Sequence, residues 1–375
     1  ANWDLAGPVD EAKLPALIDR FQGVCLGVAA ALVGEGVASI EDTDRGAKIG
    51  LRWILGPFEI MNKIGIGKTY EVVQAICRKY PDFKMPAILE TQHRLGKPFE
   101  FNFVDLEVKN GIAYVTLNRP EAMNALNETV VAQLDRRFEE AEADARVKAI
   151  VFQGAGKAFV AGADIRYFVE KIKAGRIPDI VAFTRKGHEL LLRIEASKKL
   201  TIALLDGLSL GGGSELALAC QAIVATPAGS MAFPETGIGI YPGLGGMLRM
   251  ARHVGPALAK YFAFTGAFIS AADALALGIV TKLVDPAEVD GAVRSLASGG
   301  KPDKYRARDI PEKFKPFAAL FGPGSVATLL AGKVPAGADA DLAGKVVKTL
   351  GYKAPLALRI ADDFGCHTIG IQYQQ

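Results

Sequence analysis

The chain has 375 residues, of which half are hydrophobic and 23% are charged, and its formal net charge at pH 7 is +3. This length allows two or three domains with a large buried core, and the composition is typical of a soluble globular enzyme. The small net charge gives no indication of a nucleic-acid or membrane-surface partner. Because charge or glycine interrupts every long apolar stretch, we also expect no membrane-spanning helix.

Cysteine and histidine usage restricts the compartment and the cofactors that we expect. The cysteines are widely separated, with no CxxC pair, and the histidines show no spacing typical of metal ligands. This pattern fits a reducing compartment, so we predict a cytoplasmic protein without disulfides and without a metal site. The apolar run 26–33 is short and lacks a basic flank and a cleavage site, and we do not interpret it as a signal peptide.

The first 90 or so residues have the pattern of a helical segment. Residues 12–38 carry apolar side chains at near-helical spacing, Ser39 suits the start of a second helix, and residues 69–80 form a further amphipathic pattern. The stretch 81–101 is rich in proline, glycine and charge, which indicates a boundary. We therefore predict an all-helical domain at residues 1–98.

Strands and helices alternate after this boundary. The runs 103–108 and 112–117 are rich in β-forming residues, and Asn110-Gly111 between them predicts a hairpin. Asn127 is suited to cap the next helix, whose inward face would carry Val131, Leu134, Phe138 and Ala141. Later strands are predicted at residues 149–152, 200–205 and 222–225. The alternation predicts an α/β core, which we place at residues 99–288.

The C-terminal part of the chain has weaker signals. Residues 270–277 form a short alanine-rich helix pattern, and the run after 278 leads into a last strand. Beyond about residue 290 the sequence reads as loop-rich, with weak helices at 340–350 and 354–363 and no clear period after 364. We predict a C-terminal helical and loop extension at residues 289–375.

Two glycine-containing turns are placed to bind a ligand through the backbone. Gly211-Gly212-Gly213 stands where a strand passes into a helix, so the backbone can approach a ligand closely and present the free amides of the first helical turn. The turn at residues 161–164 offers a second set of amides after another strand. Two amides that converge on one carbonyl oxygen form an oxyanion hole, where losing one donor costs roughly 10²–10³ in rate.

Two glutamates accompany these turns. Glu215 would lie about one helical turn beyond the glycines, and Glu235 follows a proline that restricts its backbone. Such a pair can divide acid and base work when burial and mutual repulsion raise at least one pKa. Each feature alone also has a purely structural explanation, as a turn or a solvated acid. The residues by themselves therefore indicate an oxyanion hole with two candidate acids and go no further.

Four segments together resemble one known family. Residues 118–126, 161–165, 211–216 and 233–246 have the motifs, order and spacing of the enoyl-CoA hydratase/isomerase (crotonase) family, over about residues 101–285. The resemblance implies a crotonase-type spiral of repeated ββα turns, here between an N-terminal all-helical domain and C-terminal helices. It also implies a homotrimer or a hexamer made of two trimers.

The resemblance assigns roles to the residues of the two turns and to the acids. It implies that the amides of Ala163 and Gly212 hold the thioester oxygen and that Glu215 and Glu235 are the two catalytic acids. The path of coenzyme A is implied at two places. The implied substrate-binding residues are Ala122 and Met123 near the adenine end and Ala161, Asp164, Ile165 and Arg166 along the path. Arg166 is suited to meet a phosphate, although a solvated helix charge explains it nearly as well.

The implied reaction is reversible syn addition of water to a short-chain trans-2-enoyl-CoA of the crotonyl-CoA type. Coenzyme A would be part of the substrate, and no cofactor is expected. We assign Glu235 as the proton donor to C2 and Glu215 as the main base for water, although both acids could share one water. The alternatives are an enoyl-CoA isomerase on the same fold and a non-catalytic CoA-binding subunit. The pathway, fatty-acid breakdown or carbon fixation, stays open.

One local departure from the family and a second resemblance complete the sequence picture. Met247-Leu248 stands where the family commonly has Thr-Gln, and we interpret these residues as packing. Residues 36–44 and 50–59 resemble the C-terminal domain of 3-hydroxyacyl-CoA dehydrogenases, which certain fused proteins, notably archaeal ones, join to a crotonase domain. The chain has no strand followed by GxGxxG, so we expect neither NAD binding nor dehydrogenase activity here. The chain is then either a fragment of a longer fusion or a fusion that lost its dehydrogenase.

Overall fold

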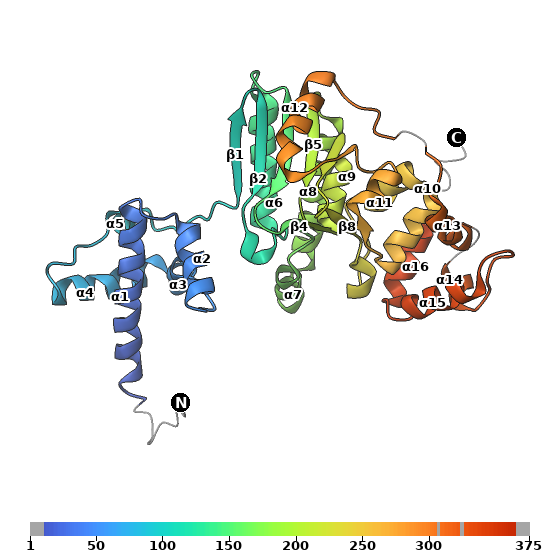
Figure 1. Ribbon diagram of the computed structural model, residues 1–375. Coiled ribbons are helices and arrows are strands. Elements are labelled where there is room, and N and C mark those ends of the chain that lie inside the picture. The colour runs from blue at the N-terminus through green and yellow to red at the C-terminus, as the bar shows by residue number, and fades with distance from the viewer. Residues whose placement is uncertain (1–10, 306–307, 323–325, 365–375) are drawn as a thin grey trace. The chain divides into compact units, whose positions relative to one another are not determined.

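The computed structural model describes residues 11–305, 308–322 and 326–364. The chain divides into two compact units, Ala1–Asn102 and Phe103–Gln375. Figure 1 shows the helices of the first unit in blue and most strands of the second in green. Our three-domain division, with limits after residues 98 and 288, stays a prediction.

The described part of the first unit consists of helices, as the sequence pattern predicted. They are α1 (Leu14–Gly34), α2 (Ile40–Gly50), α3 (Pro57–Ile64), α4 (Ile66–Lys79) and α5 (Ala87–Leu95). Ser39 caps α2, because its hydroxyl accepts a hydrogen bond from the Asp42 amide at 3.0 Å. Asp44 is buried in the same helix and accepts from the amides of Phe58 and Glu59, so it holds the start of α3.

Helix α1 is long and apolar, and it packs within the first unit. It packs against α3, α4 and α5, and a Cβ atom at Gly23 would lie 2.5 Å from the carbonyl oxygen of Val72, so glycine permits the close approach to α4. By length and composition alone this helix could cross a membrane, and the expectation that the chain has no membrane-spanning helix stays a prediction. The core helix of a soluble protein meets the same criterion.

The second unit contains two sheets. Six strands pair in the order β1-β2-β3-β5-β7-β10, in parallel except for β1 with β2. Their bounds are Val104–Lys109, Ile112–Leu117, Ala149–Gly154, Leu200–Leu205, Ala222–Ala225 and Lys282–Leu283. Four short strands form the other sheet in the order β4-β6-β8-β9, namely Ala158–Ala161, Leu208–Leu210, Ser230–Ala232 and Ile269–Ser270. In this sheet β4, β6 and β8 are parallel.

The chain builds these sheets by repeating one unit. Each of β3, β5 and β7 enters the larger sheet, and the strand that follows it, β4, β6 or β8, enters the smaller one. Helices follow each pair: α7 (Ile165–Lys173) with α8 (Ile177–Ala196), then α9 (Gly212–Ala219), then α10 (Gly246–Thr265), which bends at Gly255. This is the ββα spiral of the predicted α/β fold class, which is confirmed.

Local signals in this unit formed as predicted. Asn110 and Gly111 both have positive φ, 51° and 76°, and close the β1–β2 hairpin with Lys109 opposite Ile112. The side chain of Asn127 accepts from the Val130 amide at 2.9 Å and caps α6 (Glu128–Ala143). The predicted inward face of α6 is buried, at Val131, Leu134, Phe138 and Ala141.

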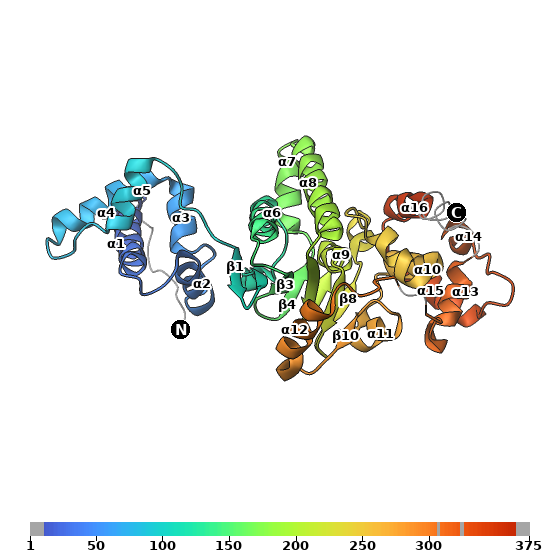
Figure 2. The ribbon, with the colours of Figure 1, turned by 90° about the horizontal axis from the view of Figure 1, so that it is seen from above.

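The core lies on both faces of the larger sheet. Along β3, Ile150 and Phe152 belong to the cluster that includes α6, α8, α9 and α10, while Ala149 and Val151 pack with α12 (Val289–Gly299) on the other face. Figure 2 shows α6 and α8 on one side of the strands and α12 on the other. Burial on both faces explains why these strands read as continuous apolar runs.

More helices occur near the C-terminus than the sequence indicated. Of the two weak helices, α15 (Ala340–Leu350) has the predicted bounds and α16 (Pro355–Phe364) begins one residue later than predicted. Besides α12, the chain forms α13 (Lys315–Phe321) and α14 (Val326–Leu330), where the pattern predicted loops. The short helix predicted at residues 270–277 is α11 (Ala271–Ala276), and Ser270 is its cap. The predicted irregular end, 365–375, lies outside the described residues.

Candidate active site

The site lies where three neighbouring strands of the smaller sheet end. Ala161, the last residue of β4, is opposite Leu210 of β6, which is in turn opposite Ala232 of β8. Because these strands are parallel, the segments that follow them leave the sheet at the same edge. Those segments carry Ala163, Gly212 and Glu235, so the fold brings the predicted groups together.

The amides of Ala163 and Gly212 are available to a ligand. Leu126 bridges to the turn after β4: its amide donates to the carbonyl of Gly162 at 2.8 Å, and its carbonyl accepts from the amide of Asp164 at 2.8 Å. The amide of Ala163, between these two residues, takes no part in the bridge. Gly212 begins α9, where the first amides have no partner within the helix. Within the described residues, neither amide donates a hydrogen bond.

The triple glycine is required by two different contacts. Gly211 has φ 47° and ψ −117°, and a Cβ atom there would lie 2.5 Å from Oε1 of Glu235. A Cβ atom at Gly213 would lie 2.1 Å from the carbonyl oxygen of Val160, so only glycine lets α9 approach β4 this closely. The glycines thus place the start of α9 against both the acid and the neighbouring strand.

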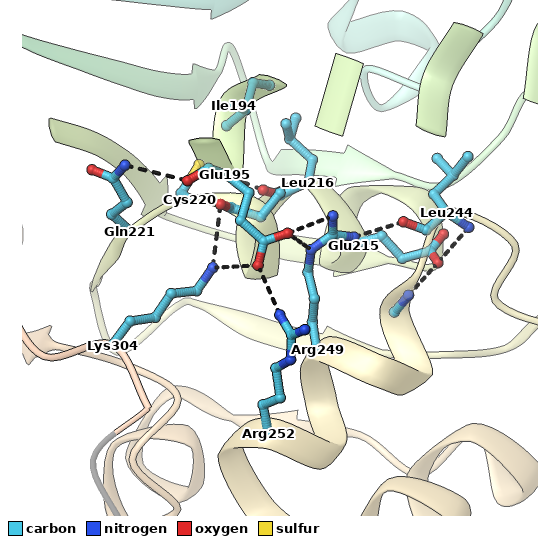
Figure 3. A network of polar contacts seen from close by, with 12 residues as sticks. Ile194, Glu195, Glu215, Leu216, Cys220, Gln221, Leu244, Arg249, Arg252 and Lys304 are labelled. Atoms are coloured by element: carbon cyan, nitrogen blue, oxygen red, sulfur yellow. Dashed lines mark hydrogen bonds and ion pairs between the residues drawn. The ribbon is translucent and has the colours of Figure 1, made fainter. Parts of the chain in front are cut away.

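Glu215 is buried in α9 and is held by a backbone turn. Its Oε1 accepts from the amides of Leu244 at 2.7 Å and Gly246 at 2.8 Å, and its exposed fraction is 2% (Figure 3). Burial raises the pKa of Glu215 to about 7, against the lowering effect of these two hydrogen bonds and of Arg249. The glycine-rich turn at residues 243–246 therefore supplies two donors to this carboxyl group.

Glu235 begins the 3-10 helix η2 (Glu235–Ile238) and has fewer partners. Its exposed fraction is 6%, and its Oε2 is buried without a hydrogen-bond partner in the described part of the chain. Burial, and next the charge of Glu215, raises the pKa of Glu235 to about 8. The neighbouring Thr236 fixes η2, because its hydroxyl donates to the carbonyl of Phe264 at 3.0 Å. A carboxyl group with one oxygen free and a raised pKa is suited to carry and release a proton.

The residues predicted for coenzyme A fall on two adjoining segments. The segments are joined by the amide of Ala161, which donates to the carbonyl of Met123 at 3.0 Å, and by the Leu126 bridge. Ala122 is half-buried, Met123 and Ile165 are exposed, and the side chain of Arg166 is 78% exposed. The fold thus brings these predicted residues together and leaves the guanidinium of Arg166 open to solvent.

Asp164 has partners that the sequence did not indicate. Its side chain caps α7 by accepting from the Arg166 amide at 3.2 Å, and its Oδ2 pairs with Nη1 of Arg119 at 2.9 Å. Both side chains of this pair are largely buried. Asp164 therefore anchors the turn that presents Ala163. Arg119 supports this anchor, and the sequence indicated it only as one residue of the motif at 118–126.

Further supporting residues were missed by the sequence reasoning. Asn124, buried at φ 57°, accepts from the Arg119 amide and donates to the carbonyl of Ala158, so it ties the segment before α6 to β4. The side chains of Leu126 and Leu244 lie 3.3 and 3.7 Å from the position of a Cβ atom on Gly212 and form the apolar wall there. Asn124 was visible only as one letter of the motif at residues 118–126.

Comparisons with known proteins agree with this arrangement. The model of the enoyl-CoA hydratase/isomerase family matches residues 112–331, and the model of the 3-hydroxyacyl-CoA dehydrogenase C-terminal domain matches residues 17–98. The chain is 39% identical over 200 residues to a short-chain-enoyl-CoA hydratase of Clostridium acetobutylicum, covering 53% of this chain and 75% of that protein. It is 38% identical over 193 residues to a crotonyl-CoA hydratase of Syntrophomonas wolfei, covering 51% of this chain and 73% of that protein.

Solved structures of similar proteins have the same fold. A carnitinyl-CoA dehydratase from Mycobacterium thermoresistibile matches with a TM-score of 0.61 and 26% identity, over 72% of this chain and 81% of that one. An enoyl-CoA hydratase from Rhodobacter sphaeroides matches with a TM-score of 0.60 and 26% identity, over 68% and 76%. The family match covers more than half of the chain, together with a dehydrogenase-type helical segment before it, an order consistent with a fused architecture. The chain belongs to the enoyl-CoA hydratase/isomerase, or crotonase, family.

Proposed function

We propose that the protein is an enoyl-CoA hydratase that adds water reversibly to a short-chain trans-2-enoyl-CoA. The observation that carries this proposal is the pair of buried acids, Glu215 and Glu235, beside two backbone amides that donate no hydrogen bond within the described residues. Relatives named short-chain-enoyl-CoA hydratase and crotonyl-CoA hydratase support the reaction and the chain length.

The amides of Ala163 and Gly212 are proposed to accept the thioester oxygen between them. As water adds at C3, the electrons of the C2–C3 double bond move toward the thioester, and negative charge develops on its oxygen. Two fixed donors in a buried site stabilise that charge most in the transition state, which is where stabilisation increases the rate.

The surroundings of the two acids support a division of labour. Two amides hold Oε1 of Glu215, and its other oxygen accepts no hydrogen bond from a described residue, so it can orient water and take its proton as the C3–O bond forms. Glu235, with the higher pKa of about 8, then gives its proton to C2. The proton that Glu215 gained balances the proton that Glu235 lost. We propose syn addition, with both acids acting on one face of the double bond.

The proposal includes no cofactor, because coenzyme A is part of the substrate. It also includes no NAD-dependent dehydrogenase activity for this chain. Residues 11–102, which the structure describes, form helices without a strand, whereas dinucleotide binding by the usual fold needs a strand that leads into a glycine-rich turn. Incubation with NAD⁺ and 3-hydroxybutyryl-CoA should give no NADH absorbance, and NADH formation would contradict this part.

The assembly and the compartment are proposals as well. Following the family resemblance, we propose a homotrimer or a pair of trimers in the cytoplasm. Native mass spectrometry of the purified chain, with a mass of 39.8 kDa per subunit, should give three or six copies. A monomer at micromolar concentration would contradict the proposed assembly.

The central experiment follows the enoyl absorbance band of crotonyl-CoA after enzyme is added. The wild-type protein should remove the band rapidly, and Glu215→Gln and Glu235→Gln should each slow the reaction by roughly 10²-fold or more, since proton transfer by a placed group contributes 10²–10⁴. Binding of coenzyme A by both variants, measured by calorimetry, controls for loss of the site. A reaction that survives both substitutions rejects the proposed mechanism.

The same experiment separates the alternatives. An isomerase would convert a trans-3-enoyl-CoA into the 2-enoyl form, so that the band grows, and would incorporate no oxygen from H₂¹⁸O. A CoA-binding subunit would bind the thioester and leave both substrates unchanged. Oxygen incorporation at C3 of crotonyl-CoA is expected from the hydratase only.

A further inference from the structure

The buried side chain of Arg249 connects the turn that holds Glu215 to a carboxylate on another helix. Arg249 lies in the first turns of α10, and its exposed fraction is 3%. Its Nη1 donates to the carbonyl oxygen of Leu244 at 2.7 Å, and its Nε and Nη2 lie 3.0 and 2.9 Å from Oε2 of Glu195. Figure 3 shows the guanidinium between these two groups.

The contact with Leu244 acts at the residue that also binds Glu215. The amide of Leu244 donates to Oε1 of Glu215, while its carbonyl accepts from Arg249, so both peptide groups of Leu244 are fixed. Gly245, at φ 91°, makes the approach possible, because a Cβ atom there would lie 2.7 Å from Nη1 of Arg249. The second amide on Glu215, from Gly246, follows directly in the chain.

Glu195 is itself firmly held at the end of α8. Besides Arg249, it accepts from the hydroxyl of Tyr305 at 2.9 Å and lies 3.7 Å from Nζ of Lys304. Burial opposes ionisation of Glu195, but the charges of Arg249 and Lys304 prevail and lower its pKa. Arg252 contacts the same carboxylate at 3.4 Å from a more exposed position, without contacting Leu244. The carboxylate is therefore ionised and gives Arg249 a fixed partner.

We propose that Arg249, anchored by Glu195, is a positioning residue for Glu215. It holds the 244–246 turn in the conformation that directs both amides at the Glu215 carboxyl group, and this inference rests on the proposed function of Glu215 as the base. Arg249 touches neither substrate nor reacting atoms. The planar guanidinium is needed because it bonds a carbonyl on one edge and a carboxylate on the other, which a lysine ammonium cannot do with the same geometry.

The charge of Arg249 has a second, separable effect on Glu215. Arg249 favours the ionised form of Glu215, so removing the charge raises the pKa of Glu215 further. Other titratable groups face this part of the site, and they are unchanged in the variants of Arg249 proposed below. They are Glu235 on η2, Glu195 and His188 on α8, Cys220 after α9, and Lys304.

The test compares Arg249→Met, Arg249→Lys and the matched control Arg252→Met in the full chain. Arg249→Met should lower kcat by about 10²-fold, with KM for crotonyl-CoA nearly unchanged, because misplacing a catalytic group by about 1 Å costs that much. Its acidic limb in the kcat profile should move to higher pH, because loss of the Arg249 charge raises the pKa of Glu215. Arg249→Lys should lose kcat through geometry while keeping the acidic limb in place. Arg252→Met should stay within about twofold of the wild type.

Hydrogen exchange supplies a readout that does not depend on turnover. In Arg249→Met and in Glu195→Gln, the amides of Leu244 and Gly246 should exchange at least about tenfold faster, while the amides of the β1–β2 hairpin keep their protection. Unchanged exchange at residues 244–246 in both variants overturns the proposal, whatever the activity. Wild-type protein that fails to hydrate crotonyl-CoA but shows the exchange effect rejects the proposed function and leaves the positioning contact established.

Discussion

Glu215 and Glu235 are both buried carboxylic acids, but their surroundings differ. Two amides compensate the negative charge of Glu215, whereas Oε2 of Glu235 has no partner among the described residues. Their pKa values, about 7 and about 8, place the form with ionised Glu215 and protonated Glu235 near neutral pH. Because the two carboxyl groups interact, the two titration steps are properties of the pair of acids together.

A bell-shaped pH profile follows from this pair. The kcat/KM for crotonyl-CoA should rise as pH passes through about 7, where Glu215 loses its proton, and fall above about 8, where Glu235 loses its own. The measurement is initial rates at constant ionic strength from pH 5 to pH 10. A profile that is flat between pH 6 and pH 9 would show that the two acids do not titrate in the catalytic cycle.

The same burial should make the ionised form of Glu235 lower the free energy of unfolding. Its folded pKa, about 8, lies above the ordinary value of 4.5, so the folded state binds the extra proton between these values and loses stability as pH rises through them. Glu235→Gln should therefore raise the free energy of unfolding by roughly 1–3 kcal/mol at pH 8.5. The gain should vanish toward pH 4.5. Denaturant unfolding of the wild type and Glu235→Gln at pH 8.5 and pH 4.5 measures this gain. An equal gain at the two pH values would exclude titration of Glu235 as the cause.

At the scale of residues, the sequence predicted the groups that follow a local pattern. The glycine turns and the two acids were recognisable because each stands beside a backbone-shaping residue. Arg249 and Glu195 were not, since their pairing joins positions 54 residues apart in the chain and depends on how α8 packs beside α10. A charged residue inside an apolar run, such as Arg249 between Leu248 and Met250, is the signal that could have indicated it.

At the scale of elements, the contact between α9 and β4 is the tightest support of the site. Gly213→Ala would place a methyl group 2.1 Å from the carbonyl oxygen of Val160, so one of the two elements must move. We expect a loss of about 1–3 kcal/mol in unfolding free energy, together with a large loss of hydration rate. Thermal unfolding and the crotonyl-CoA assay measure the two effects.

Gly344→Ala is the matched control for this substitution. Gly344 lies inside α15, and a Cβ atom there would meet nothing within 4 Å. Alanine should stabilise this helix by about 0.5–1 kcal/mol and leave the rate unchanged. If both alanine variants behave alike, the close approach at Gly213 is not what the substitution disturbs.

Most strands of the larger sheet could be predicted, whereas the smaller sheet could not. The strands at residues 112–117, 200–205 and 222–225 have the predicted bounds because apolar β-forming residues fill them. The strands β4, β6 and β8 have only three or four residues each and adjoin Gly162, Gly207 and Gly229, so the sequence there indicates turns. They exist because each pairs with its neighbour, and the site depends on that pairing.

At the scale of the whole molecule, the two compact units predict two unfolding events. Asp44 holds the start of α3 in the first unit through the amides of Phe58 and Glu59. Asp44→Ala leaves these amides without that partner and should destabilise the first unit by about 1–3 kcal/mol. Calorimetry should show one transition at lower temperature, with the other transition and the hydration rate unchanged. A shift of both transitions together would show that the units unfold as one.

The proposed donors for the thioester oxygen are main-chain groups, and this has a consequence for how the site can change in evolution. Every residue type except proline carries the same amide, so ordinary replacements at Ala163 or Gly212 alter the wall of the site and keep the donor. The acids are side chains, and a single codon change can delete either of them. Under the proposed roles, a lineage with this fold can therefore change its acid and base residues repeatedly while it keeps the backbone donors for the thioester oxygen.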